Sequence, residues 1–238
     1  MIAVRWATMA AVTLAILGAL GATLSDVQPS AQRVLAAAVV ALLAPLFWPG
    51  VAATPARTAL RVTLWSAAAA ALAAVAMWLF GAGAQPLARI AGTGAMLWLV
   101  LLATHALAAM LEQRWLGQSP DAPGAREAAG RSAAVALSLL GALPLWLGPV
   151  AETLSARHDW AIDAVVGASP LTHLAVASGN DLLRNQWFYQ HANLAALLFS
   201  YPGPAGIAWS YIAAIVLLAL AALALRRHHA REAGATHH

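Results

Sequence analysis

Long runs of apolar residues without a charged side chain are the feature that most constrains what this chain can fold into. Runs of about 20 such residues can cross the hydrocarbon core of a bilayer as α-helices. Hydrophobic residues make up 62% of the chain and charged residues only 9%, which exceeds what a soluble core of 238 residues needs. The sequence therefore predicts an all-α, polytopic membrane protein.

Six runs, each bounded by Arg, Pro or Gly clusters, qualify as transmembrane helices of a single transmembrane domain over residues 1–238. We place the predicted spans at 7–24, 34–51, 60–80, 90–111, 133–154 and 206–225. The first is interpreted as a retained span, because its apolar stretch is longer than the core of a usual secretory signal. The second is short, since Pro45 and Pro49 interrupt its C-terminal half.

The arginines indicate how the chain crosses the membrane. Under the six-span scheme, nine of the 13 basic residues fall on one side of the bilayer and four on the other. The four are Arg33, Arg89, Arg157 and Arg184. Because basic loops stay in the cytoplasm, we expect both termini there and the protein in a bacterial inner membrane. The net charge of +4 then reflects topology, so we expect the lipid bilayer as a partner and no nucleic acid.

The segment 155–205, between the fifth and sixth predicted spans, departs from the pattern of short connections. It mixes polar and aromatic residues with apolar stretches, and a disordered loop would not carry so much apolar surface. Ser169 followed by Pro170 is a good helix start, with Ser as N-cap and Pro in the first turn. We expect a re-entrant or interfacial helical hairpin here, on the outer side of the membrane.

Groups that could carry chemistry are scarce. A transporter driven by a proton or cation gradient normally has ionisable side chains inside its spans, and here only His105 lies well inside one. A lone intramembrane His more often bonds to a neighbouring helix than binds a ligand. We therefore expect no enzymatic activity in this chain and a partner subunit, such as an ATPase, as the source of free energy for any uphill transport.

Three histidines of the outer segment, His158, His173 and His191, are weak candidates for a metal or haem site. Their spacing is not a known metal signature, and the chain has no cysteine to supply thiolate ligands. We therefore expect no metal and no cofactor in this chain.

Six spans with both ends inside, a basic loop after the second span and a long semi-apolar outer segment before the sixth form a recognisable plan. It resembles the permease subunit of ABC exporters of the type-two export class. The resemblance implies a homodimer, or a heterodimer with another permease, that works with a cytoplasmic ATPase subunit, which alone binds ATP. It also implies that the loop 54–61 meets the ATPase through Arg57 and Arg61, and that the hairpin 164–200 gates the outer end of a path. The residues expected at this gate, or at a partner-docking surface, are Pro170, His173, Asp181, Arg184, Trp187 and Tyr189.

Two other functions fit the same sequence. The chain could be an assembly or structural subunit of a larger membrane complex, with the outer segment docking a partner. It could also be a haem- or metal-handling membrane protein that uses His105 and the histidines of the outer segment. The sequence names no substrate for any of the three.

Overall fold

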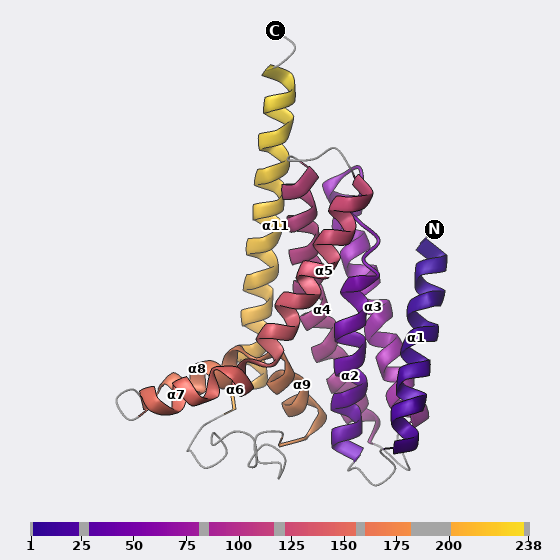
Figure 1. Ribbon diagram of the computed structural model, residues 1–238, viewed down its shortest axis with the longest axis vertical. Helices are drawn as coiled ribbons and strands as arrows, with labels where there is room; N and C mark the ends of the chain where they lie inside the picture. Colours follow the sequence, from indigo (N-terminus) through magenta and orange to yellow (C-terminus); the bar gives the residue numbers. More distant parts are fainter. Residues whose placement is uncertain are drawn as a thin grey trace.

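The computed structural model describes residues 2–23, 29–80, 86–116, 122–155, 160–181 and 201–235, and the regular structure within these ranges is helical (Figure 1). The predicted all-α class is thus confirmed. The helices are α1 (Ile2–Thr23), α2 (Pro29–Leu46), α3 (Pro55–Phe80), α4 (Leu87–Leu116), α5 (Ala122–Gly141), α6 (Leu143–Trp146), α7 (Gly148–Ser155), α8 (Trp160–Ala168), α9 (Pro170–Ser178) and α11 (Pro204–Ala235).

Four of these helices are long and apolar enough to cross a membrane. They contain the stretches Ala3–Leu20, Pro55–Leu79, Leu87–Leu116 and Pro204–Glu232. A fifth crossing results if α8 and α9, which are bent by 80° relative to each other, count as one broken span. Several long apolar helices are therefore present, as in a multi-pass membrane protein, while the sixth span stays a prediction.

Two of the predicted spans differ from the observed helices, and proline explains both differences. The run 34–51 is helical only to Leu46, because Pro49 has no N–H and disfavours a helical conformation at the residue before it. The run 133–154 is not one helix: α5 ends at Gly141, and α6 and α7 cover the remainder. Pro144 and Pro149 lie in the first turns of these two short helices, where a missing N–H costs nothing.

Helix α4 is the centre of the bundle and packs against α2, α3, α5, α9 and α11. The core is rich in small side chains, which let helices approach closely in a membrane protein. A close approach is at Gly130 of α5, where an added Cβ would lie 2.5 Å from the carbonyl oxygen of Pro45 in α2. The two backbones therefore touch at this point.

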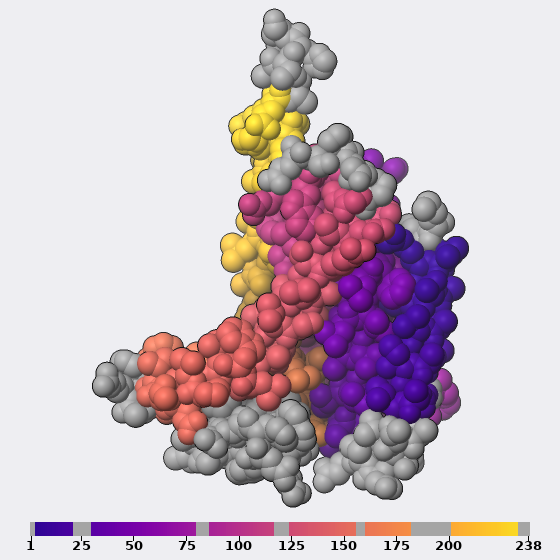
Figure 2. All heavy atoms as spheres, viewed as in Figure 1, coloured from indigo at the N-terminus to yellow at the C-terminus, as the bar shows by residue number. Residues whose placement is uncertain are grey.

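Helices α6, α7 and α8 form an arm that projects sideways from the bundle, across the direction of α2 and α4 (Figures 1 and 2). α7 packs on α8, and α9 then returns to the bundle against α4 and α2. The predicted helix start at Ser169 is confirmed, because its side chain accepts a hydrogen bond from Thr172 N at 3.4 Å with Pro170 in the first turn. Gly179 ends α9 at φ +74°, which favours glycine.

The arginines gather at two opposite ends of the bundle. At one end Arg5 donates to Trp48 O, and Arg226 donates to Ala53 O. At the other end Arg33 donates to Ser178 O, at the C-terminus of α9. We call these the basic end and the α9 end. The two groups are those that the six-span scheme predicts, as far as the described residues extend.

Candidate functional site

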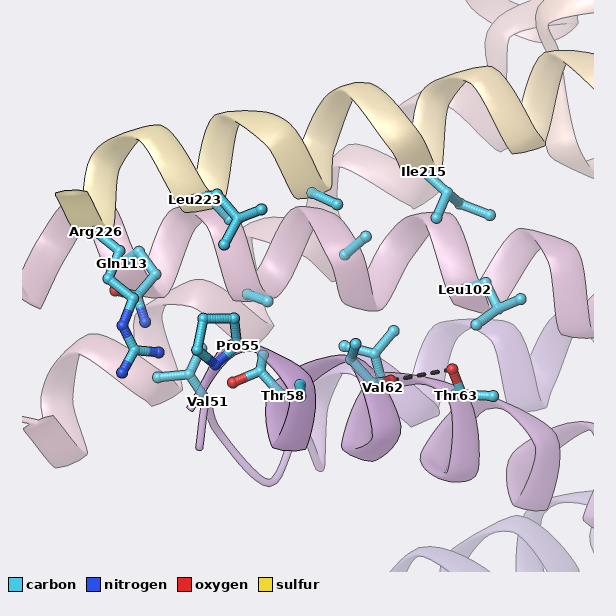
Figure 3. Close-up of a pocket in the computed structure, with 16 residues that line it drawn as sticks. Val51, Pro55, Thr58, Val62, Thr63, Leu102, Gln113, Ile215, Leu223 and Arg226 are labelled. Carbon is cyan, nitrogen blue, oxygen red and sulfur yellow. Dashed lines mark hydrogen bonds between the residues drawn. The ribbon is translucent and has the colours of Figure 1, made fainter. Parts of the chain in front are cut away.

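A groove with a volume of about 340 Å³ runs between α3 and α11, over the face of α4 that both helices contact (Figure 3). Most of its lining is apolar, and much of it is alanine. The lining residues are Val51, Pro55, Ala56, Thr58, Ala59, Val62, Thr63, Leu102, Ala106, Ala109, Gln113, Ile215, Ala219, Ala222, Leu223 and Arg226. Small side chains on all three helices therefore leave an apolar channel that larger residues would fill.

The two ends of this groove differ in polarity. Figure 3 places Arg226 and Gln113 at one end and Ile215 and Leu102 at the other. Arg226 reaches from α11 to the carbonyl oxygen of Ala53, in the loop before α3, so its guanidinium lies across the mouth. The groove is thus apolar along its length and cationic at the basic end of the bundle.

The loop 47–54 beside this mouth is held by a buried carboxylate. Glu112 of α4 is 4% exposed, and its Oε2 accepts hydrogen bonds from Trp48 Nε1 at 2.8 Å and from Val51 N at 2.9 Å. Arg61 of α3 donates to the carbonyl oxygens of Gly50 and Val51 at 2.9 and 3.0 Å. The loop is therefore fixed to both α4 and α3.

The two residues predicted to couple to an ATPase have different surroundings. Arg61 points into the loop and holds its backbone. Arg57 is exposed in the first turn of α3, where the side chain of Thr54 accepts a hydrogen bond from Arg57 N at 3.3 Å. Of the pair, Arg57 is the more exposed.

Glu112 is a residue that the sequence reasoning missed. The predicted span 90–111 ends one residue before it, and the sequence reasoning gave Glu112 no role. A signal was available, because an acidic residue in the last turns of an apolar helix rarely lies there without a partner. The partner Trp48 lies 64 positions away in the sequence, and no local pattern indicates it.

His105 lies two turns before Glu112 on the same face of α4 and is fully buried. Its Nδ1 is 2.8 Å from Ser66 Oγ of α3, and its ring stacks on Trp48 at 5.5 Å and 18°. The interpretation of His105 as a residue bonded to a neighbouring helix agrees with this contact to Ser66. Glu112, Trp48, His105 and Ser66 thus form one polar row inside the bundle.

At the α9 end, His173 joins three helices. Its Nε2 donates to Gly167 O of α8 at 2.9 Å, and its Nδ1 accepts from the Tyr211 hydroxyl of α11 at 2.9 Å. The carbonyl partner of Nε2 fixes this tautomer, because a carbonyl only accepts. Both ring nitrogens are engaged, so His173 offers none to a metal in this arrangement.

The C-terminus of α9 is held to α2. Arg33 Nε and Nη2 donate to Ser178 O at 3.2 and 2.7 Å, and Asn180 Nδ2 donates to Ser30 Oγ at 3.2 Å. A cation at a helix C-terminus also interacts favourably with the helix dipole. The broken pair α8–α9 is therefore fixed to both α2 and α11.

The structure brings together only part of the predicted gate. Pro170 begins α9, His173 lies within it, and Asp181 accepts a hydrogen bond from the Tyr201 hydroxyl just beyond it. The other predicted gate residues, Arg184, Trp187 and Tyr189, lie outside the described residues, as do the metal candidates His158 and His191. Among the residues that are described, no group of three or more His, Cys, Asp or Glu side chains is placed to hold a metal.

No family model, curated protein or solved structure matches this chain.

Proposed function

We propose that the chain is the permease subunit of an ATP-driven, ABC-type exporter in a bacterial inner membrane. It moves a substrate across the bilayer, has no enzymatic activity of its own, and depends on a cytoplasmic ATPase subunit that alone binds ATP. The observation that carries the proposal is the broken helix pair α8–α9, bent by 80° between α5 and α11 and bonded to α11 through His173.

In this proposal α1, α2, α3, α4, α5 and α11 are the six spans, and the arm with α9 is the re-entrant hairpin before the last of them. Exposed apolar side chains on the arm, such as Trp146 and Trp160, suit a position at the membrane interface. Because His173 connects the hairpin to α11, a movement of α11 would be transmitted to the outer end of the path.

The arginines support the orientation. The basic end holds Arg57, Arg61, Arg126 and Arg226, which by the positive-inside rule is the cytoplasmic end. Both termini of the chain then lie in the cytoplasm, and the α9 end faces outward.

The anchored loop supports a coupling role at the basic end. Arg57 lies on α3, so a partner that pushed on it would move α3 directly. The loop 47–54, which Arg61 of α3 holds, would pass this movement to α4 through Glu112. A loop fixed at two helices transmits force, whereas a loosely held loop would absorb it. The first test is therefore whether an ATPase docks at Arg57.

A tagged protein should be purified in mild detergent and its partners identified by mass spectrometry. We expect a nucleotide-binding subunit with the native protein and with Arg131→Glu, a matched control on an exposed arginine, and its loss with Arg57→Glu. If no nucleotide-binding subunit accompanies the native chain, the proposal is wrong.

An assembly or structural subunit is the second candidate, and the projecting arm favours it. Trp160 on the arm is 65% exposed, which suits contact with another protein. A photo-crosslinking residue at position 160 separates the two functions. Crosslinks to a second permease, identical or related, indicate an exporter, and crosslinks to an unrelated protein indicate docking.

The haem- or metal-handling function has less support from the geometry, since His173 already uses both ring nitrogens. An absorption spectrum of the purified protein tests it. A visible spectrum without absorption bands excludes haem. Substitution of His158, His173 and His191 together, without loss of activity, excludes a metal.

A further inference from the structure

The groove between α3 and α11 lies on the side of the bundle that would face lipid. Helix α11 buries only 6% of its apolar window, so most of its surface is available to hydrocarbon, and the groove runs along the inner edge of that surface. Side chains that line a gap lose the dispersion contacts that a close neighbour would give them. A flexible hydrocarbon chain fits such a channel, because it can follow a narrow apolar path.

The charge at the mouth of the groove selects among the lipids that could supply this hydrocarbon chain. Arg226 lines the groove at the basic end, and exposed Arg57 follows Ala56, which also lines it. No Asp or Glu is among the residues that line the groove. Farther along α11, Glu232 lies 3.3 Å from His228, beyond the mouth. A headgroup at this mouth therefore meets positive charge, which favours an anionic one.

We propose that this groove binds one acyl chain of an anionic phospholipid from the leaflet at the basic end, with the phosphate beside Arg226. A zwitterionic phospholipid can enter the same groove but gains less at the mouth. Two parts of the site thus have separate roles: the alanine-lined channel holds the chain, and Arg226 selects the headgroup. The site does not depend on an ATPase or on transport, so it stands or fails apart from the proposed function.

Photo-crosslinking in nanodiscs tests the proposal. The native protein is placed in phosphatidylcholine discs with a trace of phosphatidylglycerol, or of phosphatidylcholine, that carries a diazirine on one acyl chain. Adducts are mapped by mass spectrometry. We expect labelling of the groove segments 102–113 and 215–226, about fivefold stronger from phosphatidylglycerol, as expected for one basic residue at a membrane surface.

Variants separate the channel from the mouth. Ala59→Phe and Ala219→Phe fill the channel from α3 and from α11, and both positions are exposed, so the fold should tolerate them. Each should abolish groove labelling by both lipids. Arg226→Gln should lower phosphatidylglycerol labelling to the phosphatidylcholine level.

Controls use the same changes outside the groove. Leu217→Phe on the exposed face of α11 and Arg231→Gln beyond the mouth should leave the labelling pattern unchanged. Circular dichroism confirms that every variant is folded. The proposal is overturned if both lipids label the native groove equally, or if the channel-filling variants are labelled as strongly as the native protein.

Discussion

Helices α4 and α11 are similar in length and hydropathy but have opposite places in the bundle. Their candidate membrane stretches are 30 and 29 residues long. The most apolar window of each has a mean hydropathy of 1.9 and 2.4, yet 56% of the first window is buried and only 6% of the second. α4 carries buried polar side chains, including Thr93, Thr104, His105 and Glu112. The difference shows that hydropathy identifies a span, whereas polar groups that need partners place it at the centre of a bundle.

The largest loss of stability should follow substitution of Glu112, the buried carboxylate near the end of α4. In Glu112→Ala, Trp48 Nε1 and Val51 N lose their shared acceptor, and each orphaned buried donor costs about 1–3 kcal/mol. We expect the free energy of unfolding in detergent to fall by about 3 kcal/mol. Glu112→Gln, which keeps an acceptor oxygen, should lose less.

Glu127→Ala is the control for this prediction. Glu127 pairs with Arg131 at 3.2 Å on an exposed face of α5, so its loss should cost at most about 0.5 kcal/mol. Equal effects of the Glu112 and Glu127 substitutions would show that the buried carboxylate does not hold the loop 47–54.

Two glycines extend the comparison to packing. Gly130→Ala in α5 places a Cβ 2.5 Å from Pro45 O, so α2 and α5 must separate, and we expect a loss of about 2 kcal/mol. Gly206→Ala in α11 meets no atom within 4 Å and should be neutral, or stabilising by about 0.5–1 kcal/mol through helix propensity. Thermal unfolding of both variants in one detergent measures the difference, and similar midpoints would contradict it.

The positions of the long apolar helices could be predicted from the sequence, but the different burial of α4 and α11 could not. Uncharged apolar runs indicate α1, α3, α4 and α11 closely, because a hydrocarbon core requires such runs regardless of packing. Burial depends on neighbours, and the exposure of α11 leaves no mark on its hydropathy.

The arm and the polar row show two different reasons why a prediction from sequence fails. Pro144 and Pro149 were visible, yet the apolar run that contains them still satisfied the length expected of a span. By contrast, the contacts of Glu112 with the loop 47–54 are long-range and follow only from the fold. Local rules did succeed at Ser169 and Pro170, where the helix start is set by adjacent residues.

The hydrogen bond between Tyr211 and His173, which joins α11 to the hairpin, should have a moderate effect. Tyr211→Phe removes the hydroxyl that donates to His173 Nδ1, and we expect a loss of about 1 kcal/mol. A double-mutant cycle with His173→Phe should show that the two losses are not additive, since both remove the same bond. Strict additivity would mean that the two side chains act independently.

The smallest effect should come from the outer face of α11. Leu217 is 67% exposed, so Leu217→Ala removes side-chain atoms that contact lipid or detergent, which are as apolar as leucine itself. We expect the free energy of unfolding to change by less than about 0.5 kcal/mol, in contrast to the losses at Glu112 and Gly130. A second chain packed on this face would change that result, because the substitution would then weaken an interface. The loss would be larger, and it would shrink as the protein is diluted in detergent, because the native dimer then dissociates as well. Unfolding measured at two protein concentrations therefore decides whether α11 borders lipid alone or another subunit.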